Sequence, residues 1–183
     1  KFGANAYVGS MVALSLIREL GPVLTALMVI GRAGSAITAE LGIMKITEQV
    51  DALRSMAVDP VRYLMAPRVL AGIIVMPLLS GIFVTVGIFG GYFVSVGLLN
   101  LSSGTFLSQM EASVEWLDVY SGFIKSTVFG FIFGWVACYK GYMSGFGAIG
   151  VNKATTQSVV TASVAVLVVD YFLTSILTRI FFE

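Results

Sequence analysis

The chain has 183 residues, of which 57% are hydrophobic and 11% are charged, and its mean hydropathy is +0.94. Soluble domains carry about 25% charged residues, and a chain of this length has too little interior to hide so many apolar side chains. The composition therefore excludes a soluble globular protein and a disordered chain, and the near-neutral balance of 11 Lys and Arg against 10 Asp and Glu leaves no basic excess for nucleic acid.

Four long apolar stretches predict transmembrane helices. A bilayer core of ~30 Å requires about 20 helical residues, and the runs are continuous rather than alternating as in a β-barrel. The chain is therefore expected to be all-α, a polytopic membrane helix bundle forming one transmembrane domain over residues 1–183. The stretches cover residues 6–31, 69–99, 123–139 and 159–182.

Two adjacent charges, Arg18 and Glu19, interrupt the first apolar stretch. Counted from residue 6, Arg18 lies roughly 18 Å along the helix, near the bilayer centre. A charge at that depth is costly unless it is paired or hydrated. Adjacent helix positions point about 100° apart, so the two cannot face each other and each needs its own polar neighbour. We interpret them as a polar site on a substrate path, bordering a cavity between two subunits; a structural ion pair is the alternative. Leu16, Leu20 and Val23, spaced by four and three, are expected to form an apolar wall beside Glu19.

A short amphipathic helix is predicted at about residues 47–57, inside a loop that runs from residue 32 to residue 68. Its apolar residues repeat at helical spacing, and Thr47 is expected to cap its N-terminus. Its mixed polar face would not be drawn to anionic headgroups, so we expect the helix to dock on a partner protein rather than on lipid. The residues of that face are Glu48, Asp51 and Arg54.

Positive charges divide unevenly between the segments that join the apolar stretches. Residues 32–68 hold five Lys and Arg and residues 140–158 hold two, whereas residues 100–121 hold none. The positive-inside rule therefore places the first two segments in the cytoplasm and residues 100–121 on the periplasmic side. The outer segment is acidic, and we predict a short helix near residues 106–116.

Two further ionisable residues, Lys125 and Asp170, fall inside the third and fourth stretches. Because these helices run in opposite directions, the two residues reach similar depth, and an intramembrane ion pair is expected. Its interpretation is structural, within one subunit, with a proton relay as the alternative.

Small-residue motifs of the GxxxG type occur at Gly87 with Gly91 and at Gly130 with Gly134. Glycines at this spacing allow helix backbones to approach closely in a membrane. They predict helix–helix contacts, either within the bundle or between subunits.

No motif for catalysis is present in the sequence. The chain has no His, no P-loop and no nucleophile elbow, and its one cysteine, Cys138, is expected to be a packing residue. We therefore predict no catalytic residue, no metal site and no cofactor in this chain.

Several separated motifs cover nearly the whole length of the chain. They are LIRELGPVLTAL at residues 16–27, GRAGSAITAELG at 31–42, TEQVDAL at 47–53, MAVDP at 56–60 and KATTQSVV at 153–160. Together they resemble the MlaE/YrbE family, the permease subunits of MCE-linked ABC transporters. That family carries one more membrane helix and an interfacial helix on the N-terminal side, and we expect both to lie outside these 183 residues.

The resemblance implies a homodimeric permease in the bacterial inner membrane that exchanges phospholipid with a periplasmic MCE-protein carrier, for outer-membrane lipid asymmetry. The implied partners are a second copy of the chain, a cytoplasmic ATPase dimer that binds ATP and Mg²⁺, and a periplasmic ring of MCE-domain proteins. ATP hydrolysis would then belong to the ATPase, so this chain is no enzyme. The resemblance also implies that Arg18, Glu19 and Leu20 lie near the lipid path and that the helix around residues 47–57 docks on the ATPase.

Two other functions stay open from the residues alone. An ion-coupled secondary transporter could use Arg18, Glu19, Lys125 and Asp170 as a relay, and a membrane scaffold would transport nothing. The sequence shows no internal two-fold repeat, which argues against the secondary transporter. The amphipathic cytoplasmic helix favours the ATP-driven permease over both.

Overall fold

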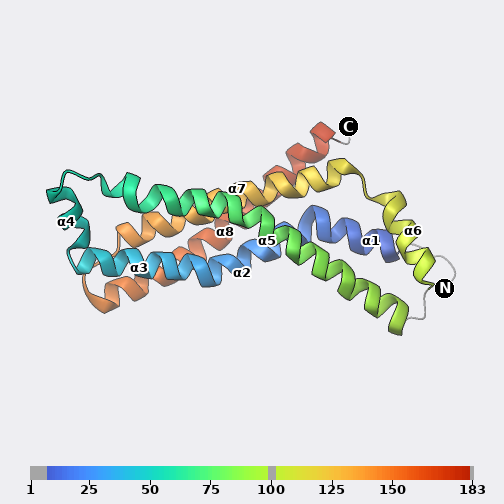
Figure 1. The fold of residues 1–183 in the computed structure, drawn as a ribbon, viewed down its shortest axis with the longest axis horizontal. Helices are drawn as coiled ribbons and strands as arrows, with labels where there is room; N and C mark the ends of the chain where they lie inside the picture. Colours follow the sequence, from blue (N-terminus) through green and yellow to red (C-terminus); the bar gives the residue numbers. More distant parts are fainter. Residues whose placement is uncertain (1–7, 99–101, 182–183) are drawn as a thin grey trace.

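The computed structural model describes residues 8–98 and 102–181, and every regular element within them is helical (Figure 1). Four helices are long and apolar enough to cross a membrane, which confirms the predicted all-α, polytopic bundle. Residues 6, 7, 99 and 182 of the predicted stretches lie outside the described part. The four spans, numbered here in chain order, are Gly9–Ile46, Val61–Gly97, Trp116–Tyr142 and Gly147–Phe181.

The spans are longer than the apolar stretches that predicted them. The first stretch was expected to end at residue 31, but the helix continues to Ile46, and the second helix begins at Val61 rather than at residue 69. Much of the predicted loop over residues 32–68 is therefore helical. Hydropathy marks the part of a helix that meets lipid, whereas backbone hydrogen bonding continues through polar residues beyond the hydrocarbon.

Two π-helical turns interrupt the first span. It consists of α1 (Val8–Ser15), η2 (Leu16–Leu20), α2 (Gly21–Val29), η3 (Ile30–Gly34) and α3 (Ser35–Ile46). At η2 the Gly21 N–H bonds to the Leu16 carbonyl, five residues back, and Pro22 has no N–H to offer the Arg18 carbonyl four residues back. Each such turn rotates the residues that follow it relative to a regular α-helix.

The short elements of the chain lie at the two opposite ends of the bundle (Figure 1). The short α4 and the α7–α8 turn lie at one end, and α6 lies at the other beside α1, with Phe106 of α6 buried near Gly9. The segments rich in Lys and Arg thus share one end. The bounds are α4 Gln49–Ser55, η4 Val61–Met65, α5 Ala66–Tyr92, η5 Phe93–Leu98, α6 Ser103–Ser113, α7 Trp116–Tyr142 and α8 Gly147–Phe181.

The main apolar core is assembled from all four spans. The third span, α7, lies at its centre and is the most buried of the four. A second cluster, formed by Leu41, Val50, Leu64 and Cys138, packs α4 against the membrane helices at the same end. The residues of the main core are Ala26, Ile30, Met76, Phe129, Phe133, Ala162 and Val166.

Glycines set how closely α5 and α7 approach. A Cβ on Gly130 would collide with the Gly72 carbonyl, and one on Gly134 would lie 3.1 Å from the Val69 Cα. The pair Gly87 and Gly91 faces the first span, where Leu16 and Val12 fill the space. Both GxxxG motifs therefore pack within the chain.

We expect Gly130→Ala to destabilise the bundle by about 1–3 kcal/mol, because the added methyl group forces α5 and α7 apart. Gly90→Ala is the matched control, since nothing lies within 4 Å of a Cβ at that position. The thermal midpoint of each purified variant measures the effect. Equal midpoints for the two variants would contradict the close α5–α7 contact.

Candidate functional site

A cluster of charged side chains joins the first, third and fourth spans, with Lys125 of α7 at its centre. The Lys125 side chain is 2% exposed, and its Nζ lies 2.7 Å from Glu19 Oε2, 2.7 Å from Thr174 Oγ1 and 3.0 Å from the Arg18 carbonyl oxygen. These acceptors use the three N–H groups of the ammonium. A buried cation in a membrane protein is thereby fully hydrogen-bonded.

The predicted pair of Lys125 and Asp170 is present, but it is only part of this cluster. Asp170 Oδ1 lies 3.4 Å from Lys125 Nζ, whereas Glu19 is nearer. Thr174, one turn after Asp170 on α8, accepts a hydrogen bond from Lys125 and donates to the Asp170 carbonyl at 2.8 Å. The two carboxylates therefore share one ammonium, and α8 is held to both other spans.

Arg18 pairs with a residue that the charge pattern assigned to the outer loop. Its guanidinium forms a salt bridge and a hydrogen bond with Asp118 Oδ1, and the Asp118 side chain is 0% exposed. Asp118 lies in the first turn of α7, where its Oδ2 also accepts the Glu115 N–H at 2.9 Å in a capping box. The Asp118 carboxylate thus caps the N-terminus of the third span and also binds Arg18 of the first span.

The break in the first span supplies one of the acceptors of Lys125. Pro22 leaves the Arg18 carbonyl without its usual helical donor, and Lys125 Nζ donates to that carbonyl instead. A proline that would otherwise leave a buried acceptor unsatisfied is therefore matched by a side chain from another helix.

The three apolar residues expected to flank Glu19 do not form one continuous wall. Leu16 packs against Gly87 of α5, and Val23 packs against the main core. Leu20 is 45% exposed on the outside of the chain. The π-helical turn at η2 explains the difference, because residues spaced by three and four no longer stack on one face across it.

The short helix α4 docks its apolar stripe on this chain and exposes its polar face. Val50 is buried in the second cluster and Leu53 packs against it. Thr47 closes the end of α3 by donating to the Ile43 carbonyl at 2.9 Å, so the prediction that it caps α4 is wrong. The residue before α4 is Glu48, which has the left-handed backbone conformation (φ 59°).

The polar residues of α4 differ in what they contact. Asp51 and Glu48 are exposed, with Asp51 3.4 Å from Arg54. Arg54 also donates to the Tyr142 hydroxyl at the end of α7. Arg54 therefore ties α4 to the third span, whereas the two carboxylates lie on an exposed surface.

Asp118 and Thr174 are the members of the cluster that sequence reasoning did not select. Asp118 had a recognisable signal, since an acidic residue three positions after Glu115 and just before an apolar run indicates a capping box. Thr174 had none, because a threonine in a membrane helix usually bonds to its own backbone.

The fold and this cluster define a polytopic membrane protein whose spans are held together by intramembrane ion pairs. The family model for the permease MlaE matches residues 1–176. The chain is 50% identical over 177 residues to the intermembrane phospholipid transport system permease protein MlaE of Haemophilus influenzae, covering 96% of this chain and 68% of that protein.

Two further relatives extend the similarity beyond that bacterium. A probable ABC transporter permease protein of Rickettsia typhi is 47% identical over 180 residues, covering 98% of this chain and 70% of the relative. The chloroplast protein TRIGALACTOSYLDIACYLGLYCEROL 1 of Arabidopsis thaliana is 37% identical over 175 residues, covering 96% and 50%. The chain belongs to the MlaE permease family.

We expect Lys125→Met to lower the stability of the protein by about 3–5 kcal/mol, because it leaves the Glu19 and Asp170 carboxylates inside the bundle without their cation. Lys140→Met, near the end of the same helix, is the control and should have little effect. Adding Glu19→Gln and Asp170→Asn to Lys125→Met should recover much of the loss, as measured by thermal midpoint. A triple variant no more stable than Lys125→Met would contradict the shared ion pair.

Proposed function

We propose that this permease moves phospholipids between the bacterial inner membrane and a periplasmic carrier made of MCE-domain proteins, and so serves outer-membrane lipid asymmetry. The name of the Haemophilus influenzae relative, an intermembrane phospholipid transport permease, supports the substrate class. The membership of an ABC permease family favours ATP-driven transport over an ion-coupled transporter or a scaffold.

The observation that carries the proposal is a polar surface at the π-helical turn η2 of the first span. The side chains of Arg18 and Glu19 remain 36% and 41% exposed although each is bound to a buried partner. Hydrocarbon cannot solvate such groups, so this surface must face protein, water or lipid headgroups. A second copy of the chain, arranged as a homodimer, would enclose it and form a central path.

The exposed Leu20 beside these charges supports a phospholipid as the substrate. An ionic headgroup requires polar contacts and acyl chains require apolar ones, and this surface offers both within one helical turn. Arg18, Glu19 and Leu20 are therefore proposed to border the path. Leu16 and Val23, which pack inward, would position that turn from behind.

ATP hydrolysis is assigned to a separate cytoplasmic ATPase dimer that binds ATP and Mg²⁺. The exposed carboxylates Glu48 and Asp51 of α4 would contact that ATPase, and Arg54 would transmit movement of α4 to α7 through Tyr142. The charge pattern supports this orientation, with α4 cytoplasmic and α6 on the periplasmic side facing the MCE ring.

We expect Leu20→Trp to lower ATP-driven phospholipid transfer about tenfold, a loss of ~1.4 kcal/mol in the transport step, by obstructing the path. Because Leu20 is exposed, the thermal midpoint should stay close to that of the unmodified protein. Leu78→Trp, at a 63% exposed position on α5, is the control. Transfer is measured between vesicles with the assembled complex, and full transfer by Leu20→Trp would refute the path assignment.

Charge reversal on α4 tests the coupling role. The double variant Glu48→Lys with Asp51→Lys should reduce co-purification of the ATPase and lipid transfer together, while the protein still inserts in the membrane. Glu111→Lys on α6, at the opposite end of the bundle, should leave the co-purification of the ATPase unchanged. Normal ATPase recovery with the double variant would show that α4 is not the docking element.

A further inference from the structure

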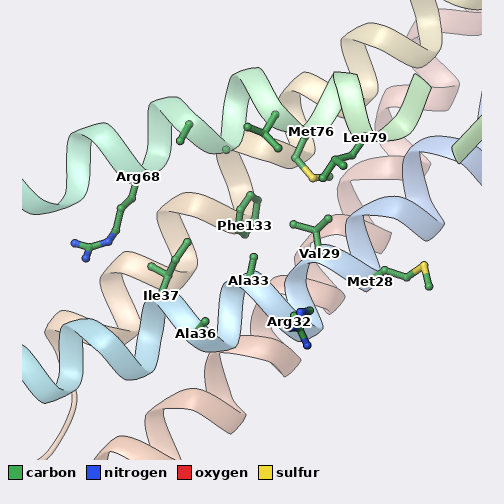
Figure 2. Close-up of a pocket in the computed structure, with 13 residues that line it drawn as sticks. Met28, Val29, Arg32, Ala33, Ala36, Ile37, Arg68, Met76, Leu79 and Phe133 are labelled. Carbon is green, nitrogen blue, oxygen red and sulfur yellow. The ribbon is translucent and has the colours of Figure 1, made fainter. Parts of the chain in front are cut away.

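A groove of about 590 Å³ runs between the first span and α5, away from the charge cluster. Figure 2 shows its two walls, with Met28, Arg32 and Ile37 on the first span and Arg68, Met76 and Leu79 on the second. Its floor includes Phe133 of α7. The lining is apolar except for Arg32 and Arg68, so both of its charges are positive.

Arg32 differs from the other charges of the first span in having no partner within the part of the chain that the structure describes. Arg18 is paired with Asp118, Glu19 with Lys125, and Lys45 Nζ donates to the Ser144 carbonyl at 2.8 Å. For Arg32 there is no counterion and no hydrogen-bond acceptor among residues 8–98 and 102–181. A guanidinium beside an apolar groove in a membrane protein is favourably neutralised by an anion from outside the chain.

Arg68, on the facing wall, is paired within the chain. Its Nη2 lies 3.0 Å from Glu40 Oε1, and its Nη1 donates to the Leu64 carbonyl at 3.0 Å. Arg32 is therefore the cation of the groove that has no carboxylate partner among residues 8–98 and 102–181. Glu40 is not among the residues that line the groove.

The two arginines lie in the half of the bundle nearer to α4. Gly34 and Val69, their close neighbours in sequence, pack against Phe133 and Gly134 of α7. Lys140 lies roughly 9 Å beyond Gly134 along α7. Long arginine side chains at this depth can reach toward the headgroups. The groove then extends toward the bilayer centre, past Val75 to Leu79.

We propose that this groove is a binding site for one phospholipid of the leaflet on the α4 side. Its phosphate binds Arg32, and an acyl chain lies along Met28, Val75, Met76 and Leu79. Charge complementarity selects this occupant, because an apolar helix would leave Arg32 without a counterion. The site is separate from the transport path proposed above and does not depend on ATP, so it can be tested without transport.

A photo-crosslinking residue, benzoylphenylalanine, placed at Val75 tests the site in the assembled complex. The complex is reconstituted in nanodiscs of phosphatidylcholine with increasing phosphatidylglycerol, and adducts are identified by mass spectrometry. We expect a phospholipid adduct that saturates with phosphatidylglycerol, and Arg32→Gln should weaken it about tenfold because a charge-assisted hydrogen bond is lost. Arg62→Gln is the matched control, since Arg62 lies outside the groove and is 90% exposed.

A second probe position separates a site from general contact with the bilayer. Ile74 is exposed on α5 but does not line the groove, so its lipid adducts should neither saturate nor depend on Arg32. Equal behaviour at Val75 and Ile74 would overturn the proposal, and so would a protein adduct at Val75, which would mean that a helix covers the groove. Ala36→Trp, which fills the groove without a change of charge, should abolish the saturable adduct while the thermal midpoint is kept.

Discussion

The burial of one ammonium group, that of Lys125, is the constraint on which the arrangement of the bundle depends. A cation that is 2% exposed inside a membrane protein needs hydrogen-bond acceptors on the helices around it. Lys125 collects them from the first and fourth spans, through Glu19, the Arg18 carbonyl and the pair of Asp170 and Thr174. The rotation of the first span, its π-helical turn and the proline that frees the carbonyl all follow from this one requirement.

Close packing by small residues is what permits those contacts. Glycines at 72, 130 and 134 let α5 and α7 approach to backbone contact, so that α7 can occupy the centre of the bundle and reach both neighbours. Nearer the C-terminal end of α7, the Thr38 hydroxyl bonds to the Ala137 carbonyl and to the Ser158 hydroxyl, which holds three spans together. The charged and the small residues thus act on the same helix, at different depths.

The chain leaves two polar features of its first span uncovered, and they differ in kind. The surface of Arg18 and Glu19 carries both signs of charge and is half-exposed, which suits contact with a second copy and with a headgroup in passage. Arg32 has no ionic partner among the described residues and lies beside an apolar groove, which suits a bound anion with a hydrocarbon tail. The turn with Arg18 and Glu19 and the turn with Arg32 can therefore contact lipid in different ways.

The sequence by itself determined the class of protein, the four spans and the family, because apolar length and local motifs are properties of consecutive residues. It also predicted that Lys125 and Asp170 would meet, since rise along two helices sets their depth. It did not predict the partners of Arg18 and Glu19, the role of Thr47 at the end of α3, or the inward turn of Leu16 and Val23. Those depend on the rotation of each helix about its axis, and only tertiary packing, with the extra residue of a π-helical turn, decides which side chains face each other.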